Sequence, residues 1–432
     1  MIHIKRSRDL SRKDRPLKNR AAPYPLNTQL RALSCIRCGA AYGLDDKVAD
    51  LGAGCSTCLA EGYPASLRLD YDKTVAWQAR PAHISMLRYV DRLPYLDFPS
   101  LGEGGTPLVE LEARELGLDR LWAKVEGQNP TGSHKDRMSA LVVARAASLG
   151  RETVIAASSG NAGASLAAYA SAAGLGCAII ATPLLNPGWA RAIELPGARL
   201  ILADTPMERW QILRKMAEEG GYPVTNYLNP PVGSNPFGLQ GYKTVGHELA
   251  EQCQGVTPTM VLVPTARGDL LWGIWQGLVE AQQIGLLPAV PRMVAVEPLT
   301  RLSRVLAGQD YRCEFPSEPH AMSSIGGSTA TYQSLAALRG SEGCAVTVST
   351  SQAQAAQRDL ARRGLYAELS SAASLAGLRV LQEQGSIDAS ERVVLILTSH
   401  GYKDPPTQEL PTPGHRAERG AVGSGLSHRK DR

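Results

Sequence analysis

The sequence predicts an α/β fold with two open, mostly parallel sheets that carry helices on both faces. From about residue 100, apolar runs of four to eight residues alternate with longer alanine-rich helical patterns. Such runs are typical of parallel strands that are buried on both faces. With 432 residues, the chain also exceeds the size at which a single core usually stops growing, so at least two domains are expected.

The expected elements succeed one another along the chain. Each strand is a continuous run of aliphatic and β-branched residues. Strands are expected at 120–127, 153–159, 177–182, 198–204, 260–265, 292–298 and 392–399. Helices are expected at 139–149, 164–173, around 190, at 207–221 and from about 270. In a sheet of this kind the chemistry lies in loops at the carboxyl ends of the strands.

The two ends of the chain differ in charge from its body. Residues 1–20 carry a net charge of +6 and residues 414–432 carry +3, so the remainder carries −4 of the total of +5. We therefore expect a basic flexible head (1–25) and a disordered basic tail (406–432) on a mildly acidic body, a pattern that argues against a nucleic-acid-binding groove. The sequence has no apolar run of about 18 residues and no apolar signal region, so neither a membrane span nor export is expected.

A cysteine-rich segment at 26–75 predicts a small zinc-ribbon-like element. Cys35 and Cys38 form one C-x2-C pair, and Cys55 and Cys58 form a second. Four thiolates complete a closed tetrahedral shell, so a zinc ion here would be structural, with reduced, unligated thiols as the alternative. Eight cysteines without an export signal indicate reduced thiols and a cytoplasmic location. The other four are expected to be small buried apolar residues: Cys177, Cys253, Cys313 and Cys344.

The turn NPTGSHKDRM, at 129–138, offers one amine, that of Lys135, at the start of an expected helix. The helix dipole repels a cation at this position, and partial burial adds to the effect, so the pKa of the amine should fall. A lysine of this kind suits Schiff-base chemistry. The alternative is a surface lysine in a helix-capping region.

Three more loops come after expected strands. AASSGNAGAS, at 156–165, places hydroxyls, an amide and backbone N–H groups at a helix start, which favours an anion site over the alternative of a simple helix cap. VPTARGDLLWG lies at 263–273. LTSHGYKD, at 397–404, ends the last strand with Thr398, Ser399 and His400.

NPTGSHKDR, SSGNAGAS, GLYAELSSAASLAGL and LTSHGYKD together resemble the fold-type-II pyridoxal-phosphate enzymes, and among these the threonine synthases most closely. The resemblance runs from about Gly102, in GEGGTPLVEL, to Asp404. It implies a catalytic region at 85–405 with a smaller subdomain at about 135–245. A cysteine ribbon also precedes the catalytic region in relatives of this kind.

The resemblance also implies roles for individual residues. Lys135 would hold pyridoxal 5′-phosphate covalently and later remove the substrate's Cα proton, and Asn161 would bond the pyridine O3′. Thr398 would face the pyridine nitrogen; because a hydroxyl does not keep that nitrogen protonated, loss of a β or γ substituent is favoured over transamination. The substrate's α-carboxylate would be held by the loop of Ser158, Ser159 and Gly160.

The chain departs from the family where the cofactor phosphate is usually held by a glycine loop. Here the loop reads Ala266-Arg267-Gly268-Asp269-Leu270. Only one glycine remains, so the Arg267 guanidinium is expected to take over part of the phosphate binding, and Asp269 must pair or turn away. Four other residues also depart from the family. Trp189 replaces a lysine that is thought to help hold the substrate phosphate in relatives, and His134 is expected to be a packed, hydrogen-bonded side chain. The remaining two are Leu369 and Ser399.

We therefore expect a pyridoxal-phosphate enzyme that eliminates or replaces a β or γ substituent of a small amino acid, with a structural Zn²⁺ and a homodimeric assembly. One alternative is a deaminating lyase of the serine/threonine dehydratase type. A second alternative, from another class, is a catalytically inactive zinc-ribbon binding protein.

Overall fold

The structure is a computed structural model that describes residues 24–46, 52–72, 79–158, 160–253, 255–316 and 320–404. The predicted tail (406–432) and all but the last two residues of the predicted head (1–25) lie outside the described residues. Ser159 also lies outside them. None of the described helices is long and apolar enough to cross a membrane.

The larger of two α/β sheets has six strands. Their spatial order is β12 (Cys344–Thr347), β11 (Arg292–Glu297), β10 (Met260–Pro264), β13 (Arg392–Leu397), β5 (Arg120–Val125) and β4 (Leu108–Leu111). All neighbours are parallel except β4, which pairs antiparallel with β5 at one edge. The sequence pattern missed β4 and β12, whose four-residue runs are only partly buried, as edge strands often are.

The smaller sheet has four strands and is wholly parallel. Their spatial order is β8 (Arg199–Leu202), β7 (Gly176–Ala181), β6 (Thr153–Ala157) and β9 (Tyr222–Pro223). The strands β6 and β7 are central and bury nearly every side chain, which explains their unbroken apolar runs. The predicted fold class, two mostly parallel sheets, is confirmed.

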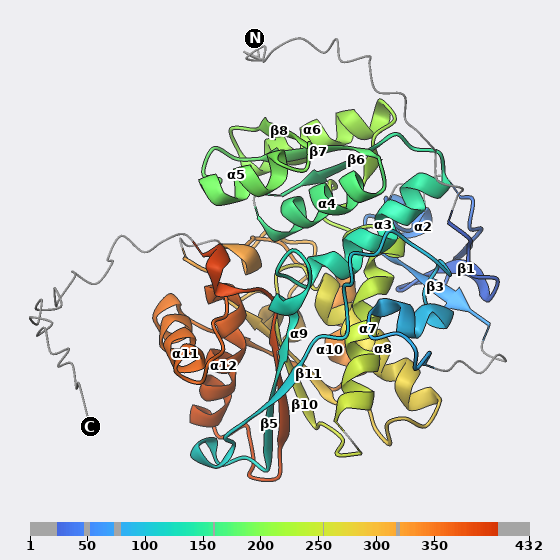
Figure 1. Ribbon diagram of the computed structural model, residues 1–432. Helices are drawn as coiled ribbons and strands as arrows, with labels where there is room; N and C mark the ends of the chain where they lie inside the picture. The colour runs from blue at the N-terminus through green and yellow to red at the C-terminus, as the bar shows by residue number, and fades with distance from the viewer. Residues whose placement is uncertain are drawn as a thin grey trace, which may run out of the picture.

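Helices cover both faces of the sheets (Figure 1). They are α3 (Lys135–Ser148), α4 (Asn161–Ala172), α5 (Pro187–Glu194), α6 (Pro206–Glu218), α7 (Pro236–Gln252), α8 (Asp269–Gln283), α9 (Leu302–Leu306), α10 (Tyr332–Gly340), α11 (Thr350–Arg362) and α12 (Leu369–Glu383). One core lies between the large sheet and α11 and α12, and a second, larger core joins the other face to α3, α7 and α8. The helices α3 and α4 begin four and three residues earlier than the sequence predicts, so their first residues are those of the candidate loops.

The cysteine-rich segment forms a three-stranded antiparallel sheet, in the spatial order β2 (Ala41–Tyr42), β1 (Leu30–Cys35) and β3 (Leu67–Tyr71), with the short helix α2 (Ser56–Ala60). In Figure 1 it lies beside α3 and α7. The hydroxyl of Tyr311, from the catalytic region, donates to the carbonyl of Pro64 at 3.1 Å, and the Arg312 guanidinium stacks 3.9 Å from the ring of Tyr63. These contacts attach the segment to the rest of the protein.

The cysteines outside this segment differ from one another in exposure. Cys177 and Cys253 are buried, as expected, and Cys344 is half-buried. The prediction was wrong for Cys313, which is exposed. It lies after α9, in a segment outside the described helices and strands.

Candidate active site

The turn that carries Lys135 is tied to the segment after β13. The amide of His134 donates to the carbonyl of Thr398 at 3.0 Å, and the amide of His400 donates to the carbonyl of Gly132 at 3.1 Å. The Ser399 hydroxyl donates to the same Gly132 carbonyl at 3.1 Å. Two motifs more than 260 residues apart in the sequence therefore meet at the carboxyl end of the large sheet.

Lys135 is the first residue of α3, and its amine has few partners. The Nζ atom lies 3.4 Å from the Tyr242 hydroxyl and 5.6 Å from the centre of that ring. Burial lowers the pKa of Lys135; the carboxylate of Asp269 opposes this effect, and the Arg267 guanidinium adds to it. A desolvated amine beside a second cation is the state that favours a free, nucleophilic lysine.

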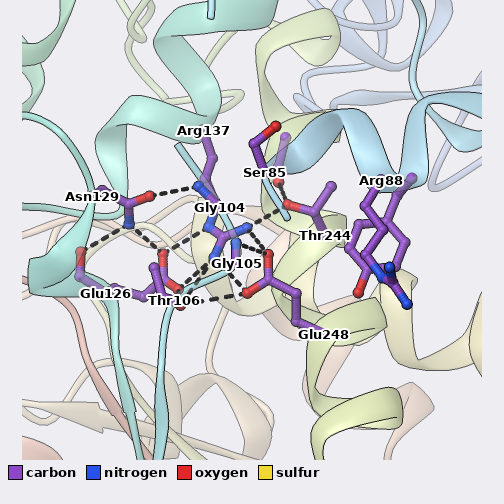
Figure 2. Close-up of polar contacts among 12 residues, drawn as sticks. Ser85, Arg88, Gly104, Gly105, Thr106, Glu126, Asn129, Arg137, Thr244 and Glu248 are labelled. Carbon is purple, nitrogen blue, oxygen red and sulfur yellow. Dashed lines mark hydrogen bonds and ion pairs between the residues drawn. The ribbon is translucent and has the colours of Figure 1, made fainter. Parts of the chain in front are cut away.

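Further along the first turn of α3, Arg137 anchors the helix from below (Figure 2). Its guanidinium bonds Glu126 at 2.7 Å through two nitrogens and Glu248 at 2.6 and 2.9 Å, and it reaches the hydroxyls of Thr106 and Thr244. All of these side chains are buried. Burial alone would raise the pKa of Glu248, but Arg137 and then Lys124 hold it well below its ordinary value.

The same network holds the turn in front of Lys135. The amide nitrogen of Asn129 donates to the carboxylate of Glu126 at 2.9 Å, and its oxygen accepts from the backbone of Gly104 at 2.9 Å. Figure 2 shows Asn129 and Glu126, from the segment between β5 and α3, converging with Arg137 of α3. The position of Lys135 thus depends on a fully bonded cluster rather than on the turn alone.

Asn161, the first residue of α4, has its amide orientation determined by charged neighbours. Its Oδ1 accepts from Lys403 Nζ at 2.8 Å and from the Ser399 hydroxyl at 3.1 Å, and its Nδ2 donates to the carboxylate of Glu368 at 2.7 Å. Because an ammonium only donates and a carboxylate accepts, the amide cannot be reversed. One of its two N–H bonds stays available. Glu368 and Lys403 lie within the sequence motifs, but the pattern of those motifs gave neither residue a role.

Thr398 lies at the end of β13, within a chain of hydroxyl groups. Its Oγ1 is 2.7 Å from the hydroxyl of Ser371, which also accepts from the amide of Ser399 at 2.9 Å. These groups are neutral, so nothing in this pair holds a proton on an aromatic nitrogen. His134, beside it, is buried with Nδ1 3.1 Å from the Thr398 carbonyl. Burial, with Lys135, lowers the pKa of His134 well below its ordinary value, as expected of a packed, neutral side chain.

Ser158 and Gly160, predicted to bind a substrate carboxylate, lie directly before α4. The Ser158 hydroxyl accepts from the amides of Gly160 at 3.3 Å and Gly163 at 3.0 Å, so it also caps the helix. The Trp189 indole covers this loop, 3.7 Å from the position that a Cβ at Gly160 would take. The hydroxyl proton of Ser158 remains available to an incoming carboxylate.

The loop between β10 and α8 contains the departures from the glycine pattern. Gly268 has a φ of +83°, and a Cβ there would overlap the side chain of Ser334, so this one glycine is required. The carboxylate of Asp269 turns toward Ser234, whose hydroxyl donates to it at 2.6 Å, and toward the amide of Gln333. Asp269 is therefore occupied away from the loop. Ala266 and Leu270 flank this turn, the first half-buried and the second buried.

Arg267, the other charged residue of this loop, differs from Asp269 in that its side chain is not paired within the described residues. In the described parts of the chain its guanidinium has no hydrogen-bond partner; it lies 5.5 Å from the ring of Trp210, on α6, and beside Gly327. Burial lowers the pKa of Arg267, and the carboxylate of Asp269 only partly offsets this. Burial, and then Arg267 itself, lower the pKa of Arg209 nearby. Such a cationic region attracts an anion.

The four cysteines predicted as metal ligands converge. Their Sγ atoms all lie within 4.8 Å of one another. Backbone amides of Arg37 and Cys38 donate to the sulfur of Cys35, and the amide of Cys58 donates to that of Cys55. N–H groups directed at sulfur stabilise thiolates, so this donor set fits a closed zinc site.

Comparison with known proteins agrees with this geometry. The model of one protein family, described as pyridoxal-phosphate dependent enzyme, matches residues 99–399. The chain is similar to a threonine synthase of Methanocaldococcus jannaschii, with 34% identity over 86% of this chain and 92% of the relative. It is also similar to a threonine synthase of Methanosarcina acetivorans, with 32% identity over 87% of this chain and 93% of the relative.

Solved structures with the same fold include threonine deaminase isoform 2 from Solanum lycopersicum in its processed form (TM-score 0.59, 20% identity, 68% of this chain and 79% of that one). A fungal L-serine ammonia-lyase from Rhizomucor miehei has a TM-score of 0.57 at 24% identity, covering 68% of this chain and 93% of that one. At these identities the likeness concerns the fold.

Proposed function

Because the chain belongs to the pyridoxal-phosphate-dependent enzymes, we propose that it eliminates or replaces a β or γ substituent of an amino acid, as a threonine synthase-like enzyme. One observation carries the proposal: the amine of Lys135 is desolvated, weakly bonded and placed where the loops after β6 and β13 meet. The substrate is a small amino acid that carries a leaving group.

The residues around Lys135 fit the cofactor. Lys135 supplies the amine that attaches the aldehyde, and the free N–H of Asn161 supplies a donor for the ring oxygen. The first amides of the 15-residue helix that follows Gly268 would bind the phosphate, and the Arg267 guanidinium would add a charged donor. Ala266, Asp269 and Leu270 contribute backbone only, since the Asp269 carboxylate is bonded elsewhere.

When bound, the cofactor withdraws electrons from the substrate's Cα. The residues of the protein then determine which bond breaks. Thr398 would offer the ring nitrogen a hydroxyl whose neighbour, Ser371, is also neutral. Because such a hydroxyl does not keep the ring nitrogen protonated, loss of a β or γ substituent is favoured over transamination. Lys135 would take the Cα proton, while Ser158, Ser159 and Gly160 would orient the carboxylate.

A Lys135-dependent chromophore tests the proposal. The purified protein should be yellow, absorbing near ~420 nm, and Lys135→Ala should remove that band after dialysis. Amino acids with phosphate, acyl or hydroxyl leaving groups should shift the band. Product analysis then distinguishes a replaced amino acid from ammonia and a 2-oxo acid, the products of a deaminating lyase. A colourless preparation whose binding to nucleic acid depends on salt would instead support an inactive zinc-ribbon protein.

We also propose one structural Zn²⁺ per chain at Cys35, Cys38, Cys55 and Cys58, a homodimer, and a cytoplasmic location. The four converging sulfurs support the metal. Metal analysis should give about one zinc per chain, and Cys38→Ser should lower this content. Light scattering of the purified protein measures the oligomeric state, and fractionation of cells measures the location.

A further inference from the structure

A pocket of about 470 Å³ opens beside the candidate site, between α4, α5 and the segment 402–404. We call it the Lys403 pocket. Its walls include Ala164, Ala168 and Ala192, the indole of Trp189 and the amine of Lys403. A volume of this size suits a small organic ligand.

The Lys403 pocket is continuous with the residues proposed to bind the substrate. Thr131, in its wall, belongs to the turn that carries Lys135. Lys403 Nζ bonds the amide oxygen of Asn161 at 2.8 Å, and Trp189 covers Gly160. A substituent on a substrate held at Gly160 and Lys135 would therefore extend into this pocket.

The ammonium of Lys403 can form hydrogen bonds beyond those it makes within the protein. In the described parts of the chain, the ammonium of Lys403 makes a hydrogen bond to Asn161 only, and it lies 4.9 Å from the centre of the Trp189 ring. An ammonium has three N–H donors, so at least one can turn to a ligand. The face of the indole ring and the methyl groups of the alanines are apolar, so they suit the apolar part of that ligand.

The charges around Lys403 limit which anion can bind there. Asp404 lines the pocket, and the carboxylates of Asp136 and Glu368 act on Lys403 from behind. Three acidic residues therefore lie around a single ammonium, although the Asp404 carboxylate also accepts from Gln357 and from the amide of Leu369. Burial, and then Glu368, raise the pKa of Asp404 to about 6, so this group is charged at neutral pH. The repulsion from these carboxylates grows with the charge of the ligand, so it disfavours a dianion more strongly than a single carboxylate, which one ammonium can pair with.

Resting on the proposed function, we propose that the Lys403 pocket receives the leaving group of the amino-acid substrate, and that this group is a short acyl chain ending in one carboxylate. Its carboxylate binds the ammonium of Lys403 and its methylene groups lie on Trp189. Phosphate and acetyl esters lack one or the other of these features. The pocket thus selects among leaving groups.

Spectral titration of the holoenzyme tests this selection. O-succinyl-, O-acetyl- and O-phospho-L-homoserine are added separately, and the half-saturating concentration of the absorbance change is measured. We expect the succinyl ester to saturate at a concentration about tenfold lower than the other two. Lys403→Met should remove this advantage, and Lys403→Arg should keep most of it. Lys215→Met, at an exposed lysine of α6, is the matched control and should change nothing.

A second measurement does not need the cofactor. Calorimetric titration of the cofactor-free full chain with monomethyl succinate should show binding that Lys403→Met weakens about tenfold and that inorganic phosphate does not match. Trp189→Ala should weaken it as well. Tighter binding of phosphate, or unchanged binding in Lys403→Met, would overturn the proposal. Absence of a Lys135-dependent band would instead refute the proposed function, and the calorimetry would still decide the ligand of the pocket.

Discussion

Two arginines near Lys135 differ in how their charge is balanced. At Arg137 every guanidinium nitrogen bonds a carboxylate, with two more bonds to threonine hydroxyls. At Arg267, in the described parts of the chain, the guanidinium has no such bond. Burial works against charge at both sites, but Glu126 and Glu248 raise the pKa of Arg137 well above its ordinary value, while that of Arg267 stays lowered.

This difference separates residues that hold the structure together, the scaffold, from residues that can bind a ligand, the site. A buried charge that is fully paired holds segments together and has little capacity for a ligand. A desolvated cation without an ion-pair partner has a free-energy cost that an anion can remove on binding. Lys135 and Arg267 are of the second kind, and the cluster at Arg137 keeps Lys135 in place. Substitutions on each side of this division can show whether it is correct.

Lys135→Ala should have the largest effect. It removes both the attachment of the cofactor and the base at Cα, so turnover should fall by at least about 10⁴-fold. Absorbance and single-turnover product analysis measure the loss. Lys215→Ala is the control and should behave like the wild type. If the Lys135→Ala protein were yellow and active, another residue would supply the amine that binds the cofactor.

Glu248→Leu should destabilise the scaffold that holds the site. It leaves the buried Arg137 and Lys124 short of a counter-charge, which should lower the free energy of unfolding by about 3–5 kcal/mol. Denaturant titration measures this. The same change at Glu110, whose partner Arg120 is exposed, should cost less than about 1 kcal/mol. Equal costs at the two positions would contradict the assignment of Glu248 to the scaffold.

Arg267→Leu should weaken cofactor binding without destabilising the fold. The free energy of unfolding of the cofactor-free protein should stay the same or rise, because an unpaired desolvated cation is removed. The affinity for pyridoxal 5′-phosphate should fall by about 1.5–3 kcal/mol, the value of a charged hydrogen bond. Equilibrium dialysis measures the affinity, and Arg304→Leu, at an exposed position, is the control. Unchanged affinity would mean that backbone amides alone hold the phosphate.

The smallest effect concerns pH at Lys403. Burial lowers its pKa to about 8, against the opposing attraction of Asp136 and Glu368. Binding of monomethyl succinate should therefore be constant between about pH 7 and pH 8, where Asp404 stays charged, and weaken about tenfold per unit above pH 8, as the amine loses its proton. The unfolded state binds more protons between pH 8 and the ordinary lysine pKa of 10.5, so this group's contribution to stability rises with pH in that window. In Lys403→Met the decline in binding above pH 8 should be absent.

Local patterns predicted much of the fold. The continuous apolar runs identified the central strands β6, β7, β10 and β13, because a strand buried on both faces needs an apolar side chain at nearly every position. The starts of α3 and α4 were placed too late, since their first residues are polar and belong to loops by composition. The edge strand β4 escaped because a half-exposed run resembles a loop.

Several partners of the site were beyond sequence reasoning. Glu368 and Lys403 lie on either side of the Asn161 amide, yet they are 207 and 242 residues away from it. The free guanidinium of Arg267 and the turn of Asp269 toward Ser234 are also outcomes of packing. The periodicity of a sequence does not indicate which of two neighbouring charged residues forms an ion pair or hydrogen bond in the folded protein.

The amino-acid sequence by itself determined which chemistry is possible. It placed a lone amine, an amide, a hydroxyl and four thiols in loops after strands, because residue type and local pattern depend on neighbours a few positions away. The tertiary structure alone decided which charges are paired and which stay free. That outcome depends on burial and on contacts between distant segments, and both exist only once the two sheets have packed against their helices.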